Sequence, residues 1–205
     1  MKVITKLLIV LLIFLSIGLK AQNFEVGFES GYGRTGSQTS YPYSPILKIF
    51  DNSHSAFFRE GLVCFYTPDS AMFSIKTGLL YCKKETDILS STNNSLKILQ
   101  LPIGCDIRIG KKYFLLFGCG LDINYLTFRK SNNTSFPLFQ IGANANIGLG
   151  LVVYKKWCFD CKYQIGYDIS KLYSTEYISN SGGLSIETYR SINGIISLGL
   201  RYRIF

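Results

Sequence analysis

Two cysteines separated by two residues form the pattern in this chain that most directly suggests chemistry. Cys158 and Cys161 give the C-x-x-C spacing of dithiol oxidoreductases, in which a helix begins after the first thiol. Here the surrounding residues alternate between apolar and polar side chains, which is typical of a strand. Positions i and i+3 of a strand face opposite sides, so these two thiols cannot pair. We interpret them as small side chains, buried or facing lipid, like Cys105 and Cys119.

The chain has a single histidine, His54, in a predicted loop. One histidine cannot form a multi-histidine metal site, and no Ser/His/Asp arrangement can be recognised around it. We therefore assign no catalytic, cofactor-binding or metal-ligating residue, and we expect a protein that is not an enzyme and carries no cofactor.

A larger set of charged residues lies at alternate positions of predicted strands, opposite an apolar face. Opposite charges in a narrow, poorly hydrated interior should pair, because an unpaired buried charge is costly. We predict that these side chains form a structural plug of ion pairs and hydrogen bonds and do not line a wide pore. The set is Glu25, Glu29, Lys76, Asp106, Arg108, Asp122, Lys162, Asp168 and Arg201.

The elements that would position this set are strands with one apolar and one polar face. From Phe139 to Val153 the odd positions are apolar and the even positions are mainly Gln, Asn and Gly. The strand near 57–67 alternates poorly, and its faces stay unassigned. We predict eight strands: Asn23–Gly33, Phe57–Thr67, Ala71–Lys84, Leu96–Ile109, Tyr113–Arg129, Phe136–Tyr154, Trp157–Lys171 and Tyr189–Phe205.

The predicted connections alternate in length along the chain. Short turns follow the second, fourth and sixth strands, whereas the links 34–56, 85–95, 130–135 and 172–188 are mostly longer. Short turns at one end and long loops at the other are typical of outer-membrane barrels. The sequence therefore predicts an all-β protein, an eight-stranded antiparallel up-and-down transmembrane β-barrel, with both termini on the periplasmic side.

The N-terminus reads as a secretory signal, with Lys2 and Lys6 before an apolar run that is short for a membrane-spanning helix. We place cleavage after Ala21, with a cut after Gly18 as the alternative. Residues 1–21 are then the signal peptide and residues 22–205 the barrel domain.

Removal of the signal with its three lysines lowers the formal net charge from +9 to +6. The remaining basic residues are scattered, which does not favour nucleic acid as a partner.

Aromatic residues lie near both ends of the predicted strands, as expected of side chains at membrane interfaces. A further apolar and aromatic stretch, Tyr41–Phe50, lies in the first long link. It either folds onto the barrel rim or forms a surface for envelope or cell-surface proteins. The predicted belts comprise Phe24, Phe73, Tyr113, Trp157, Phe159 and Tyr202 at one end, and Tyr32, Tyr81, Tyr125, Phe139 and Tyr167 at the other.

Over residues 23–205 the chain resembles the PorT-like outer-membrane β-barrels, which are similar in shape to OmpA-type barrels. The resemblance rests on four segments: Gly27–Gly31, Gly78–Tyr81, Leu99–Ile103, with Gln100 where the family often has an acidic residue, and Leu198–Phe205. It implies a small protein of the cell outer membrane with a structural or interaction role, including an accessory role in secretion. It also implies insertion by the barrel assembly machinery, which reads an aromatic C-terminal strand. Tyr202 and Phe205 fit that signal, although Phe205 faces opposite to Tyr202 unless a bulge intervenes.

A soluble, secreted, lipocalin-like barrel that binds an apolar ligand is the alternative. That fold would place the apolar side chains inside and the charged ones outside. The two interpretations thus differ in the direction in which each face of the strands points.

Overall fold

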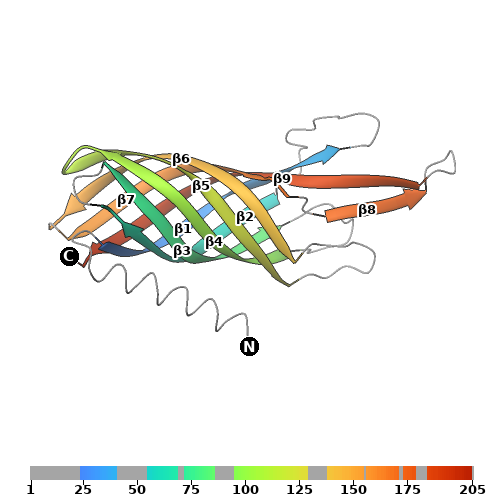
Figure 1. Cartoon of the computed structure of the whole chain (residues 1–205), viewed down its shortest axis with the longest axis horizontal. Helices are drawn as coiled ribbons and strands as arrows, with labels where there is room; N and C mark the ends of the chain where they lie inside the picture. The colour runs from blue at the N-terminus through green and yellow to red at the C-terminus, as the bar shows by residue number, and fades with distance from the viewer. Residues whose placement is uncertain are drawn as a thin grey trace.

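Nine antiparallel strands make up the computed structural model, which describes residues 24–40, 55–68, 72–85, 95–128, 138–154, 156–170, 173–178 and 184–204. The signal segment, Tyr41–Phe50, His54 and Phe205 lie outside these ranges. The strands are β1 (Phe24–Ser40), β2 (Ser55–Tyr66), β3 (Phe73–Glu85), β4 (Ser95–Ile109), β5 (Tyr113–Phe128), β6 (Phe139–Val153), β7 (Trp157–Asp168), β8 (Tyr173–Ile178) and β9 (Leu184–Arg203) (Figure 1).

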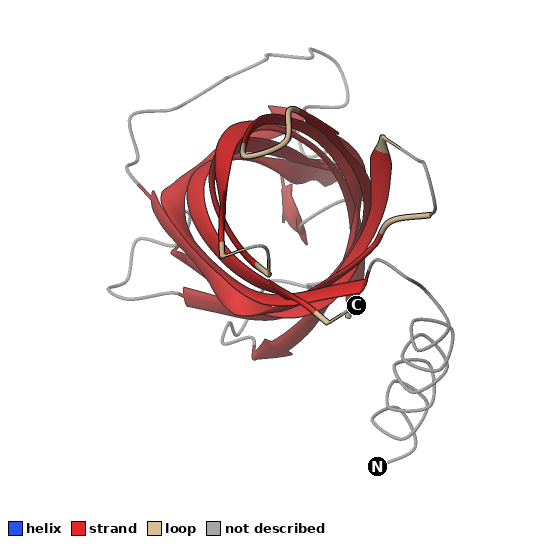
Figure 2. Cartoon of the chain, turned by 90° about the vertical axis from the view of Figure 1, so that its left-hand side faces the viewer, coloured by secondary structure: helices blue, strands red, loops and turns tan. Residues whose placement is uncertain are grey.

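Eight of these strands close into a barrel, as the sequence predicts. The order is β1 to β7 and then β9, and pairing of β1 with β9 closes the ring (Figure 2). At the seam Glu25 pairs with Arg203, and the ladder continues for the length of β1 to Ser40 and Thr188. Closure satisfies the backbone groups of both edge strands, which a wall in contact with lipid requires.

The two ends of the barrel differ. Short links join β4 to β5 and β6 to β7 at the end where β1 begins and β9 finishes, which we call the turn end. The longer links β1–β2, β3–β4 and β5–β6 lie at the opposite end, the loop end.

The apolar face of each strand points outward. In β7, Trp157, Phe159, Tyr163 and Ile165 are exposed on the outside, whereas Cys158, Asp160, Lys162 and Gln164 between them are buried. The same holds around the wall, where Leu62, Ile147, Ile196 and Leu198 are all more than half exposed. Exposed apolar side chains around a whole closed wall suit hydrocarbon as the solvent. This orientation is the reverse of the lipocalin-like alternative, which the structure does not favour.

The predicted aromatic belts lie mostly on this outer surface. Tyr113, Trp157 and Phe159 are exposed near the turn end, and Tyr32 and Phe139 near the loop end. Trp157 and Tyr202 contact edge to face with ring centroids 4.9 Å apart, and Tyr125 and Phe139 lie 5.2 Å apart. Phe24 departs from the prediction, because only 7% of it is exposed.

The prediction was wrong at the loop end. β1 continues seven residues beyond Gly33, and the predicted link 172–188 contains β8 and the first part of β9. β8 pairs with Leu184–Tyr189, and Gly36–Ser40 of β1 pairs with the other side of β9. These three segments form a sheet that extends past the barrel, hereafter the projecting sheet (Figure 1). The residues 34–40 and 172–188 are rich in Ser, Thr, Tyr and Gly, a composition typical of loops, which is why the sequence predicts links there.

No helix among the described residues is both long enough and apolar enough to cross a membrane.

Candidate functional site: the charged barrel interior

Glu29 of β1 is the centre of the ion-pair network inside the barrel. Its carboxylate accepts from Lys162 Nζ of β7 at 2.5 Å and from Lys76 Nζ of β3 at 2.9 Å. Arg59 of β2 also contacts Glu29 and donates to Gln164 of β7 at 2.8 Å. Glu29 is 1% exposed. A single buried carboxylate thus ties together four strands whose side chains meet only because the barrel is closed.

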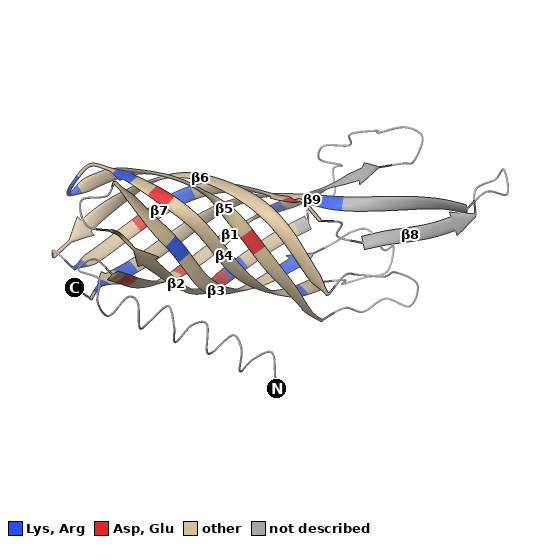
Figure 3. Ribbon diagram, in the orientation of Figure 1, with Lys and Arg blue, Asp and Glu red and all other residues tan. Residues whose placement is uncertain are grey.

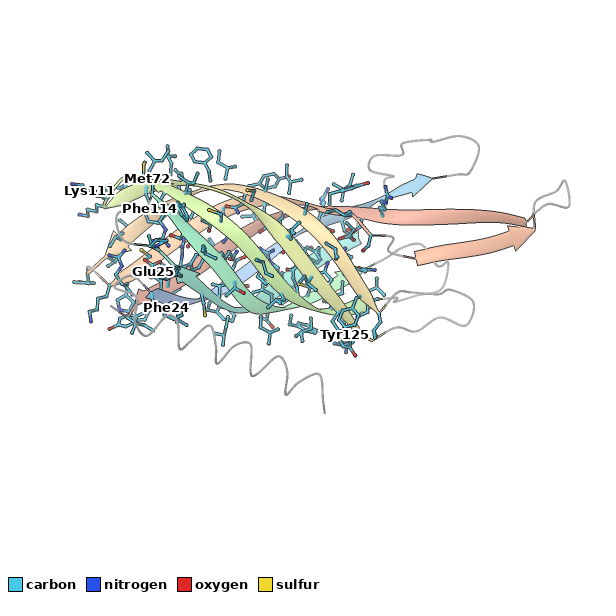
Figure 4. All side chains as sticks on the ribbon, viewed as in Figure 1. Phe24, Glu25, Met72, Lys111, Phe114 and Tyr125 are labelled. Atoms are coloured by element: carbon cyan, nitrogen blue, oxygen red, sulfur yellow. The ribbon has the colours of Figure 1, made fainter. Side chains whose placement is uncertain are left out.

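A second cluster fills the turn end around Glu25. Arg108 donates two parallel hydrogen bonds to the Glu25 carboxylate, at 2.9 and 2.6 Å, and Arg203 adds a third at 3.1 Å. Arg201 lies 3.8 Å from Glu25 and pairs with Asp160 at 2.5 Å. Lys162, 3.8 Å from Asp160, links this cluster to the one around Glu29. Figure 4 shows Glu25 near the turn end, with Lys111 and Met72 at the rim.

Aromatic rings pack among these cations. The guanidinium of Arg201 lies 4.2 Å from the ring centroid of Phe65, and that of Arg108 lies 5.7 Å from Phe65 and 5.5 Å from Phe114. Phe65 is 1% exposed and Phe114 is 4% exposed. The rings fill space between the basic side chains and attract them through cation–π contacts.

A smaller polar network occupies the half of the interior near the loop end. Lys84 of β3 contacts Asp168 at 3.3 Å and Ser191 of β9 at 2.6 Å, and Ser191 also donates to Asp168. Gln100 donates to Asn124 at 3.1 Å. A cluster of buried apolar side chains contacts this network, because Lys84 Nζ lies 5.5 Å from the ring centroid of Phe57 and Cys82 Sγ lies 3.5 Å from Gln100 Oε1. The cluster comprises Phe57, Val63, Phe65, Leu80, Cys82, Leu96, Ile98, Leu126 and Ile195.

Glycines on the inner wall make room for the longer side chains. A Cβ at Gly118 would lie 2.1 Å from Asp106 Oδ1, and one at Gly150 would lie 2.0 Å from the ring of Phe114. These positions tolerate no side chain unless the neighbour moves. The glycines at inward positions of the strands are therefore part of the packing of the interior.

Two carboxylates stand apart from the ion pairs. Asp106 accepts one weak hydrogen bond, from Asn146 at 3.4 Å, and its Oδ2 has no partner within the described residues. Asp122 Oδ1 is likewise unpartnered there. Both residues line a cavity of about 10 Å³, and Asp122 also lines a second cavity of similar size. Each cavity has room for about one water molecule.

The inward charges of the described part of the chain nearly cancel. Six acidic and seven basic side chains point inward, so the protein itself supplies most of the counter-charges. Figure 3 shows that acidic and basic positions are interspersed along the strands of the wall. The acidic residues are Glu25, Glu29, Asp106, Asp122, Asp160 and Asp168, and the basic residues are Arg59, Lys76, Lys84, Arg108, Lys162, Arg201 and Arg203.

The structure places all nine charged residues of the predicted set inside the barrel. Eight are at most 6% exposed, and the Arg108 side chain is 14% exposed. It brings seven of them into ion pairs, and among the residues that the structure describes Asp106 and Asp122 have no ion-pair partner. The predicted set did not include Arg59, Lys84, Asp160 and Arg203. Lys84, Asp160 and Arg203 occur at inward positions of strands whose period was readable, so the alternation by itself places all three inside.

Nothing in the described residues groups three or more His, Cys, Asp or Glu side chains in a way that could hold a metal ion. Cys158 is buried and Cys161 is exposed, so the two thiols of the C-x-x-C face opposite sides of β7.

No family model and no curated protein matches the chain, so the resemblance to PorT-like barrels stays a prediction. Solved structures do match. The chain aligns with Neisserial surface protein A at 15% identity and a TM-score of 0.57, covering 88% of this chain and 97% of that one. It aligns with the outer membrane protein OprG from Pseudomonas aeruginosa at 9% identity and a TM-score of 0.57, covering 90% and 96%. The closed wall, the apolar exterior and these likenesses together show that the chain is a small eight-stranded β-barrel of the outer-membrane type.

Proposed function

We propose that this protein is a non-enzymatic component of the outer membrane that anchors an interaction surface outside the bilayer. The single observation that carries the proposal is the contrast between the two parts of the molecule. The barrel interior is filled by ion pairs, whereas the projecting sheet extends the wall beyond the point where β2 stops pairing with β1. A filled barrel suits anchoring, and an extended sheet suits contact with other proteins.

The orientation follows from the usual arrangement of such barrels, with short turns and termini in the periplasm and long loops outside. The projecting sheet then lies on the cell surface. Outer-membrane lipid surrounds the wall, and the barrel assembly machinery inserts it, using the aromatic C-terminal strand that includes Tyr202.

β8 is the last strand in the sheet order, so one of its edges has no strand partner within the described residues. Such an edge presents backbone donors and acceptors that an extended segment of another protein can pair with. Envelope or surface proteins are therefore the proposed partners. The resemblance to PorT-like barrels extends the proposal to an accessory role in secretion.

Deletion of the hairpin formed by β8 and the first part of β9, which belongs to the projecting sheet, tests the interaction role. Replacement of residues 172–188 by a short Gly-Ser linker is expected to leave the barrel folded, because the pairing of β9 with β7 spans only Ile192–Tyr202. Heat-dependent migration of the membrane fraction on a gel checks folding. Proteins that co-purify with the wild type from native outer membrane should then be lost.

Deletion of residues 41–52 from the first long link is the matched control, and it should retain those partners. Loss of the partners with the control deletion, or their retention without the hairpin, would assign the interaction to another part of the molecule.

A conductance measurement tests the sealed interior. In planar bilayers the wild-type barrel is expected to show no steady ion current, because charged side chains and rings fill its interior. Arg59→Ala removes a buried side chain that reaches both Glu29 and Gln164, and it should introduce measurable current. Lys111→Ala, an exposed turn residue, serves as the control. A steady current through the wild type that is as large as the current through Arg59→Ala would contradict a sealed barrel.

A further inference from the structure

Cys105 and Cys119 face each other on the outer wall of the barrel. They are direct partners in the antiparallel pairing of β4 with β5. Both are free thiols in the structure; Cys105 is half-buried and Cys119 is exposed, and both lie on the outward-pointing positions of their strands. The outward side chains beside them are apolar and exposed, namely Ile103, Ile107, Phe117 and Leu121.

The register of the two strands allows a covalent bond. Directly opposed residues of an antiparallel pair have Cα atoms about 4.5 or 5.5 Å apart, depending on the hydrogen-bonding class of the pair. Disulfides span Cα separations of about 4.4–6.8 Å, so either class fits. Both side chains also leave the sheet on the same face.

None of the other four cysteines has a cysteine opposite it. Cys64 pairs with Val26 and Thr77, and Cys161 pairs with Leu149 and Leu198. Cys82 and Cys158 are buried on the inner face. The pairing geometry therefore selects one pair among the six cysteines of the chain.

The hairpin at this point has few inward side chains to hold its strands together. The inward pair on one side of the cysteines is Gly104 with Gly120, and on the other side it is Asp106 with Gly118. Cross-strand side-chain pairs are a main source of sheet stability, and glycine contributes none. A disulfide on the outer face would join β4 and β5 at the point where inward side chains make few contacts between the two strands.

We propose that Cys105 and Cys119 are a modification site at which a cross-strand disulfide forms in the cell envelope. One S–S bond forms and two S–H bonds break, and the two electrons and two protons pass to the disulfide of a periplasmic thiol oxidant, which leaves as a dithiol. The inference rests on the proposed outer-membrane location, because export takes the chain through an oxidising compartment. The other four thiols stay reduced.

Differential alkylation of native membranes tests the proposal. Acid-quenched membranes are denatured and treated with N-ethylmaleimide, then reduced and treated with iodoacetamide, and each cysteine is read by peptide mass spectrometry. Cys105 and Cys119 are expected to carry only the second label, and the other four cysteines only the first. In Cys105→Ser the thiol of Cys119 should switch to the first label, and the converse should hold for Cys119→Ser. Cys161→Ser, also on the outer wall, should change nothing.

First label on both Cys105 and Cys119 of the wild type would overturn the proposal, as would a peptide linking either of them to another cysteine. The same membranes are fractionated in parallel. Free thiols in a heat-modifiable protein of the outer-membrane fraction would refute the disulfide alone, whereas absence from that fraction would refute the location. Serine at either position lies on the outer wall and replaces only sulfur by oxygen, so the variant barrels should fold.

Discussion

Glu29→Gln is expected to lower the free energy of unfolding of the barrel by roughly 3–5 kcal/mol, the usual cost of removing one partner from a buried ion pair. Gln keeps the shape of the side chain but removes the charge that Arg59, Lys76 and Lys162 share. The three cations would then lie together in a nearly dry interior with no common counter-ion. Urea unfolding of the refolded barrel in lipid vesicles, followed by tryptophan fluorescence and gel migration, measures the loss.

Asp106→Asn is the matched control for this experiment. Asp106 is as deeply buried as Glu29 at 1% exposure, yet it forms no ion pair within the described residues. Removal of its charge is expected to change the unfolding free energy by at most about 1 kcal/mol, the range of an ordinary hydrogen bond. Equal losses in the two variants would show that burial alone, and not the ion pairs around Glu29, determines the contribution of an interior carboxylate.

Phe65→Ala is expected to destabilise the barrel by about 3–5 kcal/mol, as large-to-small substitutions of buried aromatic residues do. The ring of Phe65 lies under the guanidinium of Arg201 and within 6 Å of Arg108 and Lys76. Its removal leaves a cavity and also exposes three cations to one another. The same urea titration measures this loss.

Phe65→Leu separates the two contributions, because it keeps most of the apolar volume and removes only the ring. Its expected cost is smaller, about 1–2 kcal/mol, comparable with the cation–π attraction that is lost. A cost for Phe65→Ala no larger than that for Phe65→Leu would mean that the interior collapses around the shorter side chain, and that packing at this position is unimportant.

The two predictions concern different properties of the same interior. Charges that are not adjacent in sequence stabilise it through ion pairs, and apolar rings hold the basic side chains where those pairs can form. Together they test how far ion pairs and aromatic rings stabilise the filled interior of a narrow barrel.

The sequence by itself determined the closed barrel and the direction in which most side chains point. A strand has a period of two, and a wall between lipid and a polar interior needs opposite chemistry on its two faces, so the alternation in β3 to β7 could be read directly. The same reading placed Glu25, Glu29, Lys162 and Arg201 on the inward face before any partner was known.

Only the tertiary structure decided which charges meet. Glu29 and Lys162 are 133 residues apart, and their contact depends on the closure and register of the whole barrel. The faces of β2 were also unreadable, because its inward positions combine Arg59 with Phe57, Val63 and Phe65. Apolar residues are stable on that inner face because they pack against the stems and cationic groups of neighbouring basic side chains, which a period-two pattern does not report. The projecting sheet was not predicted, because its segments are short and rich in the Ser, Thr, Tyr and Gly that are typical of loops, and only the pairing of β8 and β1 with β9 identifies them as strands.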